Sequence, residues 1–130
     1  MPFEVAALLE AILLGLIYIS AAAFALKKQT GNAYAMSPRD EPIAAVGRAG
    51  RLSRAQRNFE ETFPYFLAAI VAVMVSGPGG AWSWWGCVLY LAGRTLYLPL
   101  YALGLSPWRS FAWNAATLGI PILALQPLLD

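Results

Sequence analysis

Four polar side chains stand at helical spacing directly before an apolar run. Arg51, Arg54, Asn58 and Glu61 precede the segment LAAIVAVMV. On a helix, where each residue advances about 100°, they fall within roughly an 80° arc and form one polar stripe. Arginine binds carboxylates through paired hydrogen bonds, and an asparagine amide both donates and accepts. The stripe is therefore typical of a site for an anionic ligand.

A second polar face follows further along the chain. Arg94, Tyr97 and Tyr101 share a similarly narrow helical face, and Arg94 comes after a long, mostly apolar stretch. A buried arginine needs a partner, and an unpaired carboxylate beside an apolar run is costly. We therefore expect Glu61, which lies near Pro64, to face the helix bundle and to pair with an arginine.

These charges allow two interpretations. In the first, Arg51, Arg54 and Arg57 are topology signals, and Arg94 forms a structural ion pair with Glu61. In the second, the two polar faces together form a pocket for an anionic ligand, because ionisable residues inside a membrane are functional candidates by default. The tyrosines would then supply hydroxyl groups and flat aromatic surfaces.

The amino-acid composition indicates what kind of secondary structure must position these residues. The chain has 130 residues, of which 59% are hydrophobic and 12% charged, and its mean hydropathy is +0.58. These values are typical of a membrane protein. With one cysteine, Cys87, and no histidine, an intrachain disulfide, a Cys/His zinc site and a Ser-His-Asp triad within one chain are excluded. We expect neither a metal ion nor a nucleic acid as a partner.

Four segments are predicted to be membrane-spanning helices, each needing about 20 mostly apolar residues. The polar stretch from Gly47 to Glu61 has no proline and extends the second helix beyond its apolar part. The spans run from about Phe3 to Leu26, Phe63 to Val75, Ala81 to Leu105 and Trp108 to Leu129, with turn formers between them. The prediction is a single domain over residues 1–130 with an all-α fold, an integral membrane four-helix bundle.

Basic residues predict the orientation. Seven of them lie between the first two apolar segments, and Arg109 lies at the turn before the fourth. By the positive-inside tendency, these loops and the polar faces beside them lie on the cytoplasmic side of the membrane, which the resemblance described below implies to be a bacterial inner membrane. Glu10, about two turns into the first helix, is expected to face a partner or the interior of an oligomer.

The polar residues also occur in motifs that resemble a known family. RAQRNFEETFP, then GRTLYLPLY from Gly93 to Tyr101, and then Arg109-Ser110 are similar to the MAPEG family, the membrane-associated proteins in eicosanoid and glutathione metabolism. The resemblance covers nearly the whole chain, and PRDEP, Pro38 to Pro42, resembles the bacterial branch. It implies a homotrimer that binds glutathione between neighbouring subunits near the cytoplasmic face.

The resemblance also implies roles for particular residues. Arg109 would lie near the glutathione sulfur, where a guanidinium favours the reactive thiolate, with Ser110 as a second catalytic candidate. Arg51, from the same polar stripe, joins the predicted binding set. The residues expected to hold glutathione are Arg51, Arg54, Asn58, Glu61, Arg94, Tyr97 and Tyr101.

Three functions are compatible with these features. The first is a membrane glutathione transferase or peroxidase that acts on hydrophobic electrophiles or lipid hydroperoxides entering from the bilayer. The second is a non-enzymatic lipid-binding or scaffolding protein whose polar face serves folding and trimer assembly, since a fold does not establish turnover. The third is a pocket for another anionic thiol or for a phospholipid headgroup.

Overall fold

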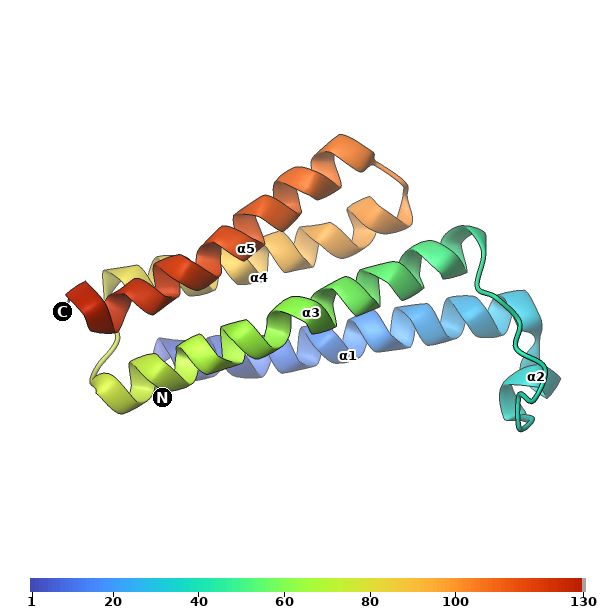
Figure 1. Cartoon of the computed structure of the whole chain (residues 1–130), viewed down its shortest axis with the longest axis horizontal. Coiled ribbons are helices and arrows are strands. Elements are labelled where there is room, and N and C mark those ends of the chain that lie inside the picture. Colours follow the sequence, from blue (N-terminus) through green and yellow to red (C-terminus); the bar gives the residue numbers. More distant parts are fainter. Residues whose placement is uncertain (130) are drawn as a thin grey trace.

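The computed structural model of the protein describes residues 1–129, and helices are the only regular secondary structure in that range. Four long helices carry the fold, and a fifth, short helix lies in the connection between the first two long ones (Figure 1). The predicted all-α class is confirmed. The helices are α1 (Phe3–Thr30), α2 (Asn32–Met36), α3 (Gly47–Ser76), α4 (Ala81–Ala102) and α5 (Ser106–Leu129).

Three of the long helices have both the length and the hydropathy needed to cross a membrane. These are α1, α3 and α5, with mean hydropathies of 2.2, 1.4 and 1.3 over their most apolar windows. The 22 residues of α4 correspond to about 33 Å, long enough for a bilayer core of about 30 Å. However, α4 is not among the helices apolar enough to span, because its sequence includes Arg94 and several tryptophans and tyrosines.

The short helix α2 corrects the prediction of a plain loop after α1. Gly31 ends α1 with a φ of 91°, a conformation that favours glycine, and Asn32–Met36 then form one further helical turn. Ser37 is extended and precedes Pro38, which disfavours helical geometry in the residue before it. The described chain therefore has five helices instead of four, and α3 begins at Gly47, as its polar extension predicts.

The long helices form two pairs, α1 with α3 and α4 with α5 (Figure 1). The contact between α4 and α5 is the most extensive in the molecule and depends on glycine. A Cβ atom added to Gly86 would lie 2.5 Å from the Leu123 nitrogen, and one added to Gly119 would lie 2.5 Å from the Gly86 oxygen. Small residues let helix backbones approach closely in a membrane, so these two helices touch through their main chains.

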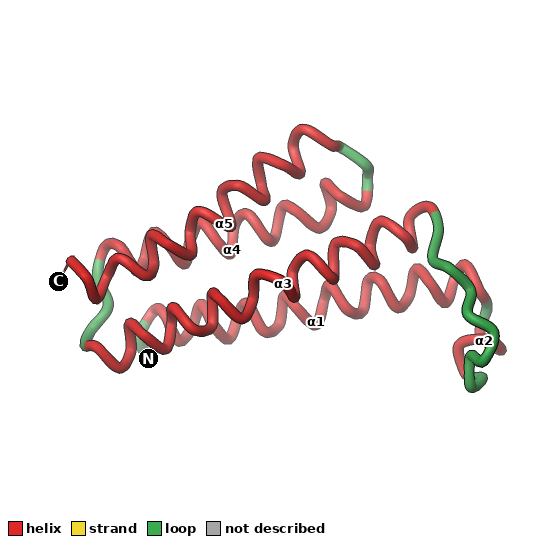
Figure 2. The backbone as a smooth tube through the Cα atoms, in the orientation of Figure 1, coloured by secondary structure: helices red, strands yellow, loops and turns green. Residues whose placement is uncertain are grey.

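The loops that connect the helices lie at both ends of the molecule. The end that contains the predicted site has more of them (Figure 2). The turn between α3 and α4, Gly77 to Gly80, lies at the end that also contains both chain termini (Figure 1). There the Ser83 hydroxyl donates to the buried Glu4 carboxylate, and the Ser83 amide donates to Gln126 Oε1 at 3.1 Å. This Glu4–Ser83–Gln126 cluster joins α1, α4 and α5 at the end opposite to the predicted site.

Candidate functional site

Arg94 is the centre of a polar network between α3 and α4. Its side chain is completely buried, with 0% of its surface exposed. Nη1 donates to Asn58 Oδ1 at 2.8 Å, and Nη2 donates to Thr62 Oγ1 at 2.6 Å. The Tyr18 hydroxyl donates to the Arg94 carbonyl oxygen at 2.6 Å, which fixes the backbone at this point. Both side-chain partners of the guanidinium are neutral.

The predicted ion pair between Arg94 and Glu61 is wrong. Glu61 is exposed and forms no ion pair or hydrogen bond with any of residues 1–129. The positions of these residues around α3 explain the difference. Asn58 and Thr62 lie about 40° apart, on the face of α3 that meets α4. Glu61 lies about 60° from Asn58 in the opposite direction, away from α4. Arg54 is at the same exposed edge of the stripe.

Aromatic rings surround the Arg94 guanidinium in place of a carboxylate. The ring centroids of Phe59, Tyr90 and Tyr97 lie 5.8, 5.9 and 5.1 Å from Cζ. Cation–π contacts of this kind contribute about 2 kcal/mol when desolvated, but they leave the net charge in place. The Arg94 Nε atom is buried without a hydrogen-bond partner among the described residues. A buried positive charge therefore remains uncompensated within the part of the chain described.

A polar pocket of about 470 Å³ opens beside this network, and we call it the Arg94 pocket. It lies between α3, the carboxyl end of α4 and the first turns of α5. Its lining residues are Asn58, Tyr97, Tyr101, Arg109, Ser110, Trp113 and Asn114. Five of the predicted site residues, Asn58, Tyr97, Tyr101, Arg109 and Ser110, are thus brought together from three helices.

Tyr101 connects the pocket to two arginines from different helices. The Arg109 guanidinium lies over the Tyr101 ring, with Cζ 4.3 Å from the ring centroid. Arg54 Nε donates to the Tyr101 hydroxyl at 3.1 Å. Arg51, in contrast, donates to the Ala102 carbonyl at 3.0 Å and so closes the carboxyl end of α4. Arg51, Arg54 and Glu61 do not line the pocket within one chain.

A comparison with family models decides what kind of protein this is. The model of the MAPEG family matches residues 4–129, nearly the whole chain. The chain belongs to the MAPEG family. No curated protein and no solved structure matches it.

MAPEG membership defines the broad class of the protein. Members of the family generally use glutathione as a substrate or cofactor, and their functions are of the membrane glutathione transferase, peroxidase or eicosanoid-related type. Together with three helices that are long and apolar enough to span, the membership makes this an integral membrane protein in contact with lipid.

Sequence reasoning missed several residues of this MAPEG site. Thr62 and Tyr90 share a hydrogen bond of 3.2 Å within the Arg94 network, and Trp113 and Asn114 line the pocket. Two of them had a detectable signal, because Thr62 follows Asn58 by four residues and Asn114 follows Ser110 by four, and residues at this spacing share a helix face. Tyr90 and Trp113 had no comparable signal among many aromatic residues.

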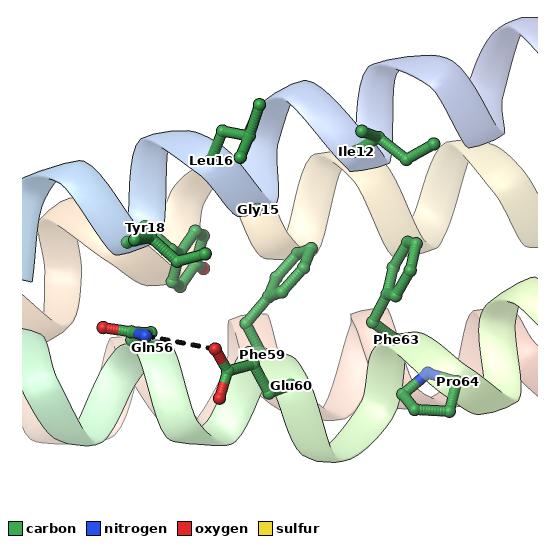
Figure 3. A pocket seen from close by; sticks show the side chains of 10 residues that line it. Ile12, Gly15, Leu16, Tyr18, Gln56, Phe59, Glu60, Phe63 and Pro64 are labelled. Carbon is green, nitrogen blue, oxygen red and sulfur yellow. Dashed lines mark hydrogen bonds between the residues drawn. The ribbon is translucent and has the colours of Figure 1, made fainter.

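A second cavity lies on the other side of Phe59. It is a groove of about 230 Å³ between α1 and α3, lined mainly by apolar side chains (Figure 3). Figure 3 shows Phe59 pointing from α3 towards Gly15 of α1, with the hydrogen-bonded pair Gln56 and Glu60 beside it. Phe59 also contacts Arg94, and Tyr18, which lines the groove as well, donates to the Arg94 carbonyl, so these two rings connect the groove to the polar network.

Proposed function

We propose that this MAPEG protein is a membrane glutathione transferase or peroxidase that acts on a hydrophobic electrophile or a lipid hydroperoxide. The observation that carries this proposal is the uncompensated charge of Arg94 next to a pocket lined by polar side chains. A buried cation without a counter-ion is unfavourable, so an anionic ligand in the adjacent pocket would stabilise it. Glutathione carries two carboxylates and fits this requirement.

The residues present match the polar groups of glutathione. The cavity of about 470 Å³ is within the usual range for small-molecule sites, roughly 300 to 1,000 Å³. Asn58 and Asn114 supply amide donors and acceptors, and Tyr97 and Tyr101 supply hydroxyl groups. Arg109, which lines the pocket, and Arg54, which donates to the Tyr101 hydroxyl from outside it, would supply guanidinium groups for the thiol and the carboxylates.

Arg109 is the proposed catalytic residue. A guanidinium next to a thiol favours the thiolate, which is the nucleophile in both conjugation and peroxide reduction. In conjugation, the thiol proton leaves to solvent, the sulfur forms a bond to the electrophilic carbon, and the leaving group departs with its electron pair. The hydrophobic acceptor would arrive from the lipid around the helices.

We further propose that the active form is a homotrimer with its sites on the cytoplasmic side of a bacterial inner membrane. Glu10 and Glu61 are exposed in the single chain, although Glu10 lies within a membrane-spanning helix. A neighbouring subunit that covers them would give these carboxylates partners. The basic residues of the first connection lie at the pocket end of the molecule, which supports the cytoplasmic orientation.

Calorimetric titration of glutathione into the purified protein in detergent is the first test. We expect saturable binding that is lost in the variant Arg54→Ala, while the variant keeps its trimer mass. Absence of binding to a well-folded protein would refute the proposal and favour a non-enzymatic lipid-binding or scaffolding role. Competition with other low-molecular-weight thiols and with short-chain phospholipids would identify a different anionic ligand.

The catalytic role of Arg109 needs its own measurement. Ultraviolet absorbance reports the thiolate of bound glutathione, and a model electrophile reports conjugation. We expect Arg109→Ala to bind glutathione but to form less thiolate and to lose about 100-fold in conjugation rate, a typical cost of removing one electrostatic stabiliser. Unchanged thiolate formation and rate would show that Arg109 does not act on the sulfur.

A further inference from the structure

A second polar depression lies between the carboxyl end of α1 and the amino end of α3. It has a volume of about 300 Å³ and shares no lining residue with the Arg94 pocket. We call it the Lys28–Arg48 pocket. Its lining residues are Ala25, Lys28, Gln29, Val46, Arg48 and Ala49.

One side chain, that of Gln29, donates one hydrogen bond and accepts another, and the two bonds hold this pocket in shape. Gln29 Nε2 donates to the Ala44 carbonyl at 2.9 Å, and the Val46 amide donates to Gln29 Oε1 at 3.0 Å. The amide of Gln29 thus fastens the segment before α3 to the last turn of α1. As a result, Lys28 and Arg48, which are 20 positions apart in the sequence, line the same depression.

The pocket combines two positive charges with no negative one. Neither Lys28 nor Arg48 forms an ion pair or a hydrogen bond within residues 1–129, and no acidic residue lines the pocket. The amino end of α3, where no side chain caps the helix, adds partial positive charge to the same region. Besides the polar Gln29, the remaining lining residues, Ala25, Val46 and Ala49, are apolar.

The position of the pocket indicates which anion it would meet. Lys28 lies in the last turn of α1, the most apolar of the candidate spans, so the pocket is at the level where that helix leaves the hydrocarbon. Basic pockets at this depth bind the headgroups of anionic lipids. We propose that the Lys28–Arg48 pocket binds the phosphate of an anionic phospholipid.

The test is a lipid titration of the delipidated full-length protein in neutral detergent, read by native mass spectrometry. The probes are phosphatidylglycerol and phosphatidylcholine with identical acyl chains. We expect saturable binding of phosphatidylglycerol, and a loss of about fivefold in its affinity in Lys28→Gln and in Arg48→Gln, which corresponds to about 1 kcal/mol for each basic residue near the membrane surface. Excess glutathione should not displace the lipid, whatever its effect on the Arg94 pocket.

Matched variants distinguish binding in the pocket from a general attraction of anionic lipid to positive charge on the protein surface. Lys27→Gln and Arg39→Gln remove the same charge from the same end of the protein, but neither residue lines the pocket. We expect both to retain the parent affinity. Gln29→Ala keeps every charge but releases the segment before α3, so it should weaken phosphatidylglycerol binding about as much as Arg48→Gln. Circular dichroism and elution volume would verify that each variant is folded.

Three results would overturn the proposal. Equal affinity for phosphatidylglycerol and phosphatidylcholine would mean that the pocket does not recognise an anionic headgroup. Equal losses in Lys27→Gln and Lys28→Gln would assign the preference to diffuse surface charge. If inorganic phosphate bound as tightly as the lipid and was lost in the same variants, the ligand would be a soluble phosphate.

Discussion

The two ends of the molecule each contain a cavity of about 470 Å³, but the cavities differ in what lines them. The Arg94 pocket is lined by polar or aromatic side chains from three helices. The cavity at the other end, which we call the terminal cavity, is lined by backbone turns, by apolar side chains and by a single carboxylate, that of Glu4. Equal volume therefore does not mean equal capacity to bind a ligand.

The ionisable residues at the two ends explain this difference. Glu4 is buried, accepts a hydrogen bond from Ser83 and lies against the glycine turn between α3 and α4. It joins helices, and no second polar side chain in the terminal cavity points to a ligand. Arg94 has donors in excess of its partners and stands behind several further polar groups. Convergence of polar side chains, more than volume or the presence of a charge, distinguishes a binding site.

Removing Arg94 should have the largest effect. In Arg94→Ala, Asn58 and Thr62 lose their donor and a cavity remains, so we expect the free energy of unfolding to fall by about 3–5 kcal/mol. Arg94→Met fills most of that space without a charge and should retain more stability while losing glutathione affinity. Denaturation in mixed micelles and calorimetry would measure the two effects. Wild-type affinity in Arg94→Met would contradict the role that we assign to the charge.

At the opposite end, Glu4→Ala should affect stability alone. The Ser83 hydroxyl would lose its buried acceptor, which should lower the free energy of unfolding by about 1–3 kcal/mol. Because the two sites are distant and share no partner, glutathione affinity should change by less than about twofold. Ser83→Ala is the matched variant on the other side of the same hydrogen bond. A larger change in affinity in either variant would show that the two ends are coupled.

Tyr101→Phe tests the contribution of a single hydrogen bond at the Arg94 pocket. The substitution removes only the hydroxyl that accepts a hydrogen bond from Arg54, and it keeps the ring beneath Arg109. We expect glutathione affinity to fall about fivefold, equivalent to about 1 kcal/mol for one hydrogen bond. Tyr65→Phe makes the same chemical change at an exposed position of α3 and should leave the affinity unchanged.

Ser110→Ala should have the smallest effect, although Ser110 lines the pocket. Its hydroxyl donates to the Ser106 carbonyl at 3.2 Å, within its own helix, and is therefore already engaged. We expect kcat/KM for conjugation of a model electrophile to change by less than about twofold, because a local hydrogen bond of this type contributes little. A 100-fold loss would instead identify Ser110 as a catalytic residue.

Helical periodicity predicted which polar residues share a helix face. Most of the residues of the candidate site could be predicted from this local property. Asn58 and Arg94 meet because both lie on the faces where α3 and α4 contact each other, whereas Glu61 lies at the exposed edge of the α3 stripe and was wrongly paired. The neutral partner Thr62 shares the helix face of Asn58, but it was missed because a hydroxyl in an apolar helix is usually expected to bond only to its own backbone.

In the fold, too, features that depend on local sequence were predicted and features that depend on distant contacts were not. Apolar length predicted α1, α5 and the second half of α3; α4 was predicted although it is less apolar than these, and the polar start of α3 follows from the absence of proline before residue 64. The short helix α2 was missed, because one helical turn between Gly31 and Pro38 depends on a few backbone angles and has no periodic signal. The glycine contact between α4 and α5 was also missed, since a single sequence does not show which glycines face each other.

That glycine contact has a mechanical consequence. Where main chains touch without intervening side chains, little can slide or rotate, so α4 and α5 should move as one rigid body. This rigid body contains three lining residues of the pocket, Tyr97, Tyr101 and Arg109, whereas Asn58 belongs to α3. The width of the Arg94 pocket is therefore set by a single degree of freedom, the tilt of the α4–α5 pair against α3. A ligand that joins the two sides would restrict that tilt.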